Sequence, residues 1–298
     1  MQAMILAAGF GTRLKPYSLC RPKPLFPVLN KPFLAAVIDR IKKAGCETIV
    51  VNTHHLQEQF RLFLSGIDGV ILQEEETILG TGGGLRKAVT HLQSEPLLVT
   101  NGDIYHTIDF RNVIEEHGVS GCDITMVLHD FPRFNTVSVR EADIVGFDGE
   151  QGRQYAYTGI QVVNPLIINE IPLDSFSCII DYYRRLLRQG VKIRALIVDQ
   201  IHWCDMGTPA DYLMLHEALL AGSMPVWPEL EVKRQLERIV VDEYARLGEG
   251  ICIDGWACIG NADIGANTKI SRSIIWDGSV IAPGSVLTDC IVTPDQTV

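Results

Sequence analysis

The sequence predicts an α/β protein in which a mostly parallel, helix-covered β-sheet is followed by a short parallel β-helix. Two observations lead to this fold class. Over residues 1–220, short apolar runs alternate with amphipathic segments, the pattern of strands that helices bury on both faces. From residue 251 the apolar residues instead recur every five or six positions, with glycines between them, which is the period of hexapeptide coils.

Strands and helices are expected to alternate along the first part. The strands are predicted at residues 3–8, 48–53, 69–73, 96–101, 123–129 and 192–198. The helices are predicted at residues 33–44, 55–65, 83–93, 109–118, 177–189 and 209–221. Residues 134–164 contain several short β runs between turn residues, and we expect them to form antiparallel strands that cap one side of the sheet.

The composition changes in the C-terminal quarter of the chain. Residues 229–248 follow a proline-containing linker and combine helical spacing with alternating charge, so we expect a connecting helix there. The predicted organisation is a first domain at 1–222, a linker and connecting helix at 223–250, and a β-helix at 251–298. Because one coil takes about 18 residues, only two or three coils fit, and they must lean on the first domain or on another subunit.

Composition and charge exclude several classes of protein. The 298 residues carry a formal net charge of −10, which argues against a general nucleic-acid binder but leaves room for a local basic pocket. No apolar run is long enough to predict a membrane span, and the apolar start lacks the basic segment of a signal peptide. The eight scattered cysteines include no C-x-x-C pair, so we expect reduced thiols and a cytoplasmic protein.

A glycine turn directly follows the first predicted strand, in "AAGFGTRLKPYSLCRPKPLFPVLNKP" (residues 7–32). It is not a dinucleotide fingerprint, since Leu14 stands where the third glycine belongs, and it lacks the P-loop lysine motif. The prolines that follow forbid a helix until about Phe33. We therefore expect phosphates to be met by backbone N–H groups together with Arg13 and Lys23. Prolines on both sides of Lys23 restrict its backbone and lower the entropy lost on gripping a phosphate.

Two aspartates end strand-to-loop segments in similar contexts. Asp103 closes "LLVTNGD", and Asp205 lies in "HWCDMGTPADY" ahead of a helix opened by Thr208 and Pro209. Ligands of parallel sheets bind beyond the carboxyl ends of the strands, and magnesium prefers one or two carboxylates plus phosphate oxygens and water. Either aspartate alone is typical of a plain turn; the pair beside a basic phosphate loop indicates a magnesium site.

A glycine-rich stretch, residues 80–84, is the third candidate element. Four glycines in five positions would let the backbone lie against a flat ligand such as a nucleotide base. The backbone N–H and C=O groups could then form hydrogen bonds with the edge of the base. Thr81 and a nearby acid, Glu74 or Glu75, would add contacts. The structural alternative is a flexible loop that leads into the helix predicted at 83–93.

Taken together, "LAAGFGTRL…RPKPLFPVLNKP", "LGTGGGLRKA", "NGD" and "WCDMGTPADY" resemble the sugar-1-phosphate nucleotidyltransferases, also called NDP-sugar pyrophosphorylases. The resemblance covers residues 1–220 in order and spacing. It implies a Rossmann-like nucleotide-diphospho-sugar transferase domain with a mixed, mostly parallel sheet. The tail "SIIWDGSVIAPGSVLTDCIV" resembles the left-handed parallel β-helix that many of these enzymes carry.

The resemblance also implies roles for individual residues. It makes Arg13 and Lys23 catalytic contacts to the phosphates and Asp103 and Asp205 the ligands of Mg²⁺. It places the sugar substrate at Asn101 and Gly159. It assigns nucleotide binding to Ala8, Gly9, Gly11, Thr12, Arg13 (which is also catalytic), Glu75, Gly80 and Thr81.

The implied reaction joins a nucleoside triphosphate to a sugar 1-phosphate, giving an NDP-sugar and pyrophosphate by in-line displacement. Many relatives carry E-K-P before the sugar-site T-G-I, but "VGFDGEQGRQYAYTGI" has no lysine here; Arg153 is a candidate replacement. This shortened form resembles the subgroup that handles mannose, N-acetylmuramic acid or heptose 1-phosphates. We favour mannose 1-phosphate with GTP, and UTP- or CTP-dependent transfer to another sugar 1-phosphate, including glucose, stays an alternative.

Two other classes compete with this enzyme. A hexapeptide acyltransferase needs a histidine near the coils, but every histidine lies at or before His216. A non-catalytic, nucleotide-sugar-binding regulatory subunit would need fewer of the charged residues than this chain retains. For partners we expect only the triphosphate and the sugar phosphate, with neither nucleic acid nor membrane. The β-helix is a candidate contact surface for a homo-oligomer.

Overall fold

The computed structural model describes residues 1–147, 149, 152–232 and 238–295. Contacts within the chain group into two compact units. Unit 1 comprises Met1–Gly9 and Ile38–Trp203, and unit 2 comprises Phe10–Val37 and Cys204–Val298. The proline-rich segment after the first strand therefore shares a unit with the C-terminal part of the chain, far from it in sequence.

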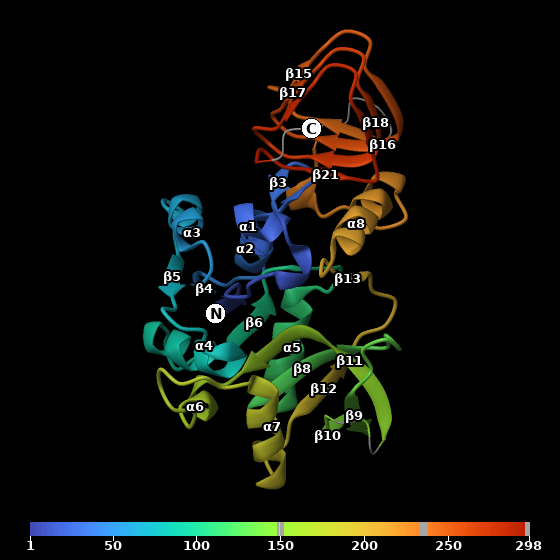
Figure 1. Ribbon diagram of the computed structural model, residues 1–298. Coiled ribbons are helices and arrows are strands. Elements are labelled where there is room, and N and C mark those ends of the chain that lie inside the picture. The colour runs from blue at the N-terminus through green and yellow to red at the C-terminus, as the bar shows by residue number, and fades with distance from the viewer. Residues whose placement is uncertain (148, 150–151, 233–237, 296–298) are drawn as a thin grey trace. The chain divides into compact units, whose positions relative to one another are not determined.

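Unit 1 is built on one nine-stranded sheet, in the order β5-β4-β1-β6-β11-β8-β12-β10-β9 (Figure 1). Each strand predicted in the first part is present within a few residues of its expected bounds. The strands are β1 (Gln2–Leu6), β4 (Thr48–Thr53), β5 (Val70–Glu74), β6 (Leu97–Asn101), β8 (Ile124–His129), β9 (Val137–Arg140), β10 (Asp143–Gly146), β11 (Arg153–Val163) and β12 (Arg194–Ile197).

The sheet is mixed, as predicted. β1 is parallel to β4 and β6, β4 to β5, and β8 to β12. β11 runs antiparallel to both β6 and β8, and β9 and β10 form an antiparallel edge. The expectation that residues 134–164 only cap the sheet is therefore wrong for β11, which lies inside it. Its residues from Thr158 to Val163 are all buried, as a central strand covered on both faces requires.

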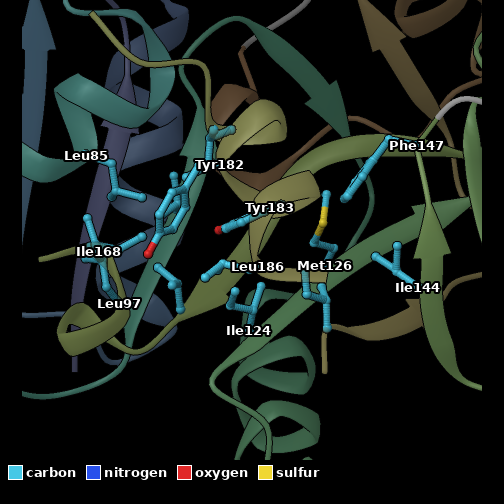
Figure 2. Close-up of a cluster of buried hydrophobic side chains, with 14 of the residues drawn as sticks. Leu85, Leu97, Ile124, Met126, Ile144, Phe147, Ile168, Tyr182, Tyr183 and Leu186 are labelled. Carbon is cyan, nitrogen blue, oxygen red and sulfur yellow. The ribbon is translucent and has the colours of Figure 1, made fainter. Parts of the chain in front are cut away.

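Helices pack against this sheet and share an apolar core with it. Figure 2 shows part of the core, in which Leu97 and Ile124 from the sheet pack with Tyr183 and Leu186 from a helix. The Tyr183 hydroxyl donates to Gln161 Oε1 at 2.8 Å, which satisfies its polar end inside the core. The further elements are α3 (Gln57–Leu64), α4 (Gly80–Ala88), η3 (Val89–His91), β7 (Ile104–His106), α5 (Phe110–Ser120), α6 (Pro165–Ile168) and α7 (Ile179–Arg188).

Short turns, a hairpin and one long helix make up the first part of unit 2. The expectation that the prolines forbid a helix before Phe33 is wrong for Tyr17–Cys20, which form the short helix α1. Pro16 stands just before this helix, where its missing N–H costs no helical hydrogen bond. The next helix, α2 (Phe33–Lys43), begins where the prolines end; its residues up to Val37 are grouped with unit 2 and those from Ile38 with unit 1. The elements are η1 (Thr12–Leu14), α1 (Tyr17–Cys20), η2 (Lys23–Leu25), β2 (Pro27–Val28), β3 (Lys31–Pro32), α8 (Pro209–Ala221) and η4 (Pro228–Leu230). No helix in the described part of the chain is long and apolar enough to cross a membrane.

The C-terminal residues form stacked parallel strands, drawn orange to red in Figure 1, which agrees with the predicted β-helix; its left-handedness stays a prediction. One ladder pairs Ile253 with Ile270 and Ile270 with Leu287, so one apolar residue from each coil points into a common core. One sheet contains β14 (Ile239–Val241), β16 (Cys252–Ile259), β18 (Lys269–Ile275), β20 (Val286–Thr288) and β21 (Ile291–Val292). The other contains β15 (Arg246–Leu247), β17 (Asp263–Ile264) and β19 (Val280–Ile281).

The connecting helix expected at 229–248 is wrong for the described residues, and 233–237 lie outside them. β14 and β15 occupy the C-terminal part of this segment, and β14 pairs in parallel with Ala257–Ile259 of β16. The β-branched run Ile239–Val241 is buried, and such residues fit a pleated surface better than a helix. The first coil thus begins at residue 239 instead of 251.

Unit 2 contains a fully buried histidine, His216. His216 of α8 has no exposed surface, and its Nδ1 and Nε2 lie 3.0 Å from Tyr212 O and 3.3 Å from the Leu29 backbone N. Burial lowers the pKa of His216 from its ordinary 6.5 to about 4, because the charged imidazolium would lose its hydration.

Lowering the pH from 7.5 to 5.0 should therefore cost the protein about 2 kcal/mol of stability through His216 alone. In this window the unfolded chain binds a proton that the folded chain excludes, so the contribution is intact above pH 6.5 and is lost as the pH falls toward 4. Urea unfolding of the wild type and of His216→Gln at both pH values measures this, since the wild type should lose about 2 kcal/mol more than the variant. Equal losses would contradict it.

Candidate functional site

Unit 2 contains a compact cluster of two cations around one carboxylate. Lys23 Nζ donates to Asp205 Oδ1 at 2.8 Å, and Arg13 reaches the other oxygen, Oδ2, at 3.3 Å. The Lys23 side chain is only 7% exposed, whereas that of Arg13 is 61% exposed. Asp205 therefore holds a buried ammonium on one oxygen and a solvent-exposed guanidinium on the other, a distribution of charge suited to meeting an anionic ligand.

The proline-rich loop brings both cations to Asp205 through a series of tight turns. Gly11 adopts the left-handed conformation, with φ of 61°, and leads into η1, which carries Arg13. Pro22 is extended, and η2 begins at the next residue, Lys23. Leu25 N bonds back to Pro22 O at 2.8 Å, closing a turn that fixes the backbone from which the Lys23 side chain extends.

Sequence reasoning missed one residue of this cluster, Gly207. Its N–H donates to Asp205 O at 2.7 Å. A Cβ at this position would lie 2.9 Å from the guanidinium nitrogens of Arg13 and 2.9 Å from Asp205 Oδ2, closer than real Cβ contacts allow. The available signal was the glycine two residues after Asp205 in "CDMGT", in a loop where a functional carboxylate was already expected.

Helix α8 begins four residues after Asp205, at Pro209, as predicted. Thr208 is the N-cap, and its side chain accepts from Asp211 N at 3.2 Å while its hydroxyl donates to Asp211 Oδ2 at 2.7 Å. Such a reciprocal cap fixes the direction in which the chain enters the helix. The Asp205 loop is thus anchored at its C-terminal end.

In unit 1, the residues at the end of β1 lie beside a network around Glu75. Ala7 N donates to Asn52 Oδ1 at 2.9 Å, and Asn52 Nδ2 donates to Glu75 Oε1 at 2.7 Å. Glu75 is only 1% exposed, and its second oxygen accepts from Leu79 N at 3.1 Å. Ala8 is half-buried and Gly9 exposed. The Glu75 carboxylate is therefore fixed by hydrogen bonds on both oxygens, in a buried position.

The glycine-rich stretch is helical, so the alternative of a flexible loop at 80–84 is wrong. These residues form the first turns of α4, which starts at Gly80 instead of the expected residue 83. Gly82 N donates to Ser177 O at 2.8 Å, and Thr81 Oγ1 accepts from Ile179 N at 3.1 Å. A Cβ on Gly83 would lie 2.3 Å from Ser175 O. Small side chains are needed here so that the helix can pack against the segment before α7.

The two predicted sugar-site residues come together in unit 1. Gly159 sits where the register of β11 shifts between Tyr157 and Gln161, and a Cβ on it would lie 3.0 Å from Asn101 Nδ2. Asp103 follows in the turn after β6 and is half-buried. This turn is tied to the sheet because Gly102 N donates to Leu6 O at 2.9 Å.

The candidate replacement for the missing lysine, Arg153, begins β11 and is mostly exposed. It lies 3.6 Å from Asp130 and over the ring of Tyr155. Its assignment to the sugar phosphate stays a prediction.

The donor chemistry of the predicted metal ligands fits Mg²⁺. No group of three or more His, Cys, Asp or Glu side chains able to hold a metal occurs among the described residues. Magnesium does not require such a group, because it is usually held by one or two carboxylates together with phosphate oxygens and water. Asp103 and Asp205 each offer hard carboxylate oxygens of this kind, one in each unit.

Comparison with known proteins gives a consistent result. The family model described as nucleotidyl transferase matches residues 2–222. The chain is 31% identical to a mannose-1-phosphate guanylyltransferase of Mycobacterium tuberculosis, over 96% of this chain and 83% of that protein. It is 29% identical to a D-glycero-alpha-D-manno-heptose 1-phosphate guanylyltransferase of Aneurinibacillus thermoaerophilus, over 71% and 95%. HddC of Yersinia pseudotuberculosis, solved with GMP-PN, superposes with a TM-score of 0.60 at 25% identity, over 72% and 97%.

Gly159→Ala should destabilise the protein more than Gly190→Ala, although both glycines have nearly the same positive φ, 86° and 83°. A Cβ at Gly190 meets nothing within 4 Å, so this control should cost only about 1 kcal/mol of backbone strain. The Asn101 side chain crowds the Cβ at Gly159, and we expect a loss of about 2–4 kcal/mol. Denaturant unfolding of both variants measures the difference, and equal losses would contradict the close approach of Asn101.

Proposed function

The chain belongs to the nucleotidyl transferase family and is a sugar-1-phosphate nucleotidyltransferase, and we propose that it transfers a guanylyl group from GTP to mannose 1-phosphate. The products are then GDP-mannose and pyrophosphate. The cluster of Lys23, Arg13 and Asp205 carries the proposal, because two cations of the loop that follows β1 are paired there with one carboxylate from the segment before α8. The names of both guanylyltransferases that the chain resembles support the choice of guanine, and the name of the Mycobacterium tuberculosis relative supports mannose.

In the proposed reaction, an oxygen of the sugar 1-phosphate forms a bond to the α-phosphorus of GTP. The bond from that phosphorus to the oxygen bridging to the β-phosphate breaks, and pyrophosphate leaves with the electron pair. Both reactants are anions, so their repulsion is a large part of the barrier. Catalysis consists of aligning them for in-line displacement and stabilising the transition-state charge.

Lys23 is the residue best placed to supply that stabilisation. Its ammonium is buried beside Asp205, where a charge acts more strongly than in water. Arg13 is exposed and has the planar fork of donors that binds phosphate in two places. We assign Arg13 to the leaving phosphates and Lys23 to the reacting one.

The other assignments follow the same proposal. Asp103 and Asp205 would hold Mg²⁺, which, when bound, neutralises phosphate charge and fixes phosphate oxygens. The glycine turn, Ala8 to Thr12, offers backbone N–H groups to the triphosphate. Glu75, Gly80 and Thr81 would contact the nucleotide base, with Glu75 held in place by its buried hydrogen-bond network. Asn101 and Gly159 would line the binding site of the sugar.

We place the activity in the cytoplasm, because all eight cysteines are free thiols, as a reducing compartment favours. An assembly through the β-helix stays a prediction. Neither statement is needed for the reaction, which uses residues of a single chain.

The proposal predicts pyrophosphate release from GTP and mannose 1-phosphate in the presence of Mg²⁺. Lys23→Ala should lower turnover by about two or more orders of magnitude, because it removes the buried charge beside the reacting phosphate. Lys15→Ala is the matched control, since Lys15 lies in the same loop with its side chain exposed, and it should keep near-normal turnover. A coupled pyrophosphate assay measures both variants.

The same assay, run over four nucleoside triphosphates and several sugar 1-phosphates, tests the substrate choice. Faster release with UTP or CTP would contradict the assignment of guanine. Tight binding without release for any pair would favour a regulatory subunit, and normal turnover of Lys23→Ala would contradict its assigned role.

A further inference from the structure

The proposed reaction uses both Lys23 and Asp205, which form an ion pair at 2.8 Å, and helix α8 of unit 2 adjoins the segments that carry them. Resting on the proposed function, we infer that His216 is a positioning residue for the Lys23–Asp205 pair. It lies on α8, whose N-terminus is anchored to the Asp205 loop and whose side chains hold the hairpin that follows Lys23. A single helix thereby fixes both partners of the ion pair.

The first attachment is at the start of the helix. Gly207 N donates to the backbone oxygen of Asp205, and Thr208 caps α8 through Asp211. Only two residues separate Asp205 from this cap. The backbone that carries the Asp205 carboxylate is therefore held close to the first turn of α8.

The second attachment follows one side of the same helix. The Tyr212 hydroxyl donates to Pro27 O, and one turn further on, His216 Nε2 accepts from Leu29 N. Residues four apart lie on one face of a helix. Successive turns of α8 therefore hold successive positions along the β2–β3 hairpin.

The chemistry of the imidazole is dictated by its partners. A carbonyl only accepts, so the Nδ1 that faces Tyr212 O must carry the proton, and the Nε2 that faces the Leu29 N–H must be bare. His216 thus acts in its neutral form, with one donor and one acceptor in use. Trp256 of β16 stacks against the ring at 6.4 Å with an interplanar angle of 14°, which limits its freedom to turn.

The hairpin turn needs such a restraint. Leu29 and Asn30 both have positive φ, 50° and 64°, a conformation that Asn tolerates but that a bulky residue such as Leu rarely adopts. Asn30 is held by the β-helix, since its Nδ2 donates to Ile259 O at 2.6 Å and its Oδ1 lies 3.0 Å from Cys258 Sγ. Leu29 is held by His216. Without that bond the first residue of the turn can relax.

A change in the hairpin is transmitted to Lys23 over a short, rigid path. Phe26 N bonds to Lys23 O at 3.0 Å, so the residue before β2 is part of the turn that carries the lysine. Phe26 is fully buried, with its ring 5.5 Å from Tyr212 and 4.7 Å from Trp276. Because Phe26 directly precedes β2 and is hydrogen-bonded to Lys23, a shift of β2 should displace the Lys23 backbone.

Two substitutions separate positioning from mere folding. His216→Phe keeps a ring against Trp256 but loses both hydrogen bonds. His216→Gln keeps an acceptor for Leu29 N. We expect His216→Phe to lower kcat about tenfold or more with KM for GTP within about twofold, since misalignment affects transfer more than binding. His216→Gln should recover kcat to within about threefold of the wild type.

A second readout does not depend on activity. Amine-labelling followed by mass spectrometry gives the rate at which Lys23 reacts, with the exposed Lys15 as internal reference. The ratio of the two rates should be low in the wild type and in His216→Gln. It should rise about threefold or more in His216→Phe, because a displaced ammonium leaves its buried position.

The two readouts distinguish the possible failures. If the wild type releases no pyrophosphate with any substrate pair, the proposed function fails, and the labelling ratio still decides the positioning role. An unchanged ratio in His216→Phe overturns the inference whatever the kinetics. A His216→Gln variant as impaired as His216→Phe, with both folded by circular dichroism, also overturns it.

Discussion

The interaction on which the candidate site depends is the pairing of Asp205 with two cations of the proline-rich loop. A nearly buried ammonium such as that of Lys23 is stable only beside an opposite charge, and Asp205 provides that charge at 2.8 Å. The same carboxylate leaves its second oxygen to the exposed Arg13. Charges arranged in this way need little reorganisation when an anion arrives, which is how preorganised sites lower barriers.

This requirement explains why a segment from the start of the chain shares a compact unit with its C-terminal part. The extended Pro22 leads into the turn η2 that Lys23 begins, but the prolines cannot hold the hairpin that follows. Helix α8 supplies hydrogen bonds to Pro27 and Leu29, and the β-helix supplies a carbonyl to Asn30. The coils, which bury little alone, thus contribute to the site by supporting its most constrained turn.

The sequence predicted the elements whose signals are local. Apolar runs located the sheet strands, and the five-to-six residue period located most of the coils, because burial on one or two faces imposes these patterns directly. It failed where partners distant in sequence decide. The place of β11 depends on pairing with β6 and β8, and β14 is a strand because β16 lies beside it. The roles of Gly83 and Gly207 depend on neighbours that no spacing reveals.

The central claim is that Lys23 and Asp205 depend on each other energetically, and a double-mutant cycle tests it most directly. The free energy of unfolding in urea would be measured for the wild type, Lys23→Met, Asp205→Asn and the double variant. A coupling of about 1–3 kcal/mol is expected, since Asp205→Asn leaves the buried Lys23 ammonium without an opposite charge, whereas Lys23→Met leaves Asp205 with only the exposed Arg13. A coupling within about 0.5 kcal/mol of zero, the range expected for independent sites, would contradict it.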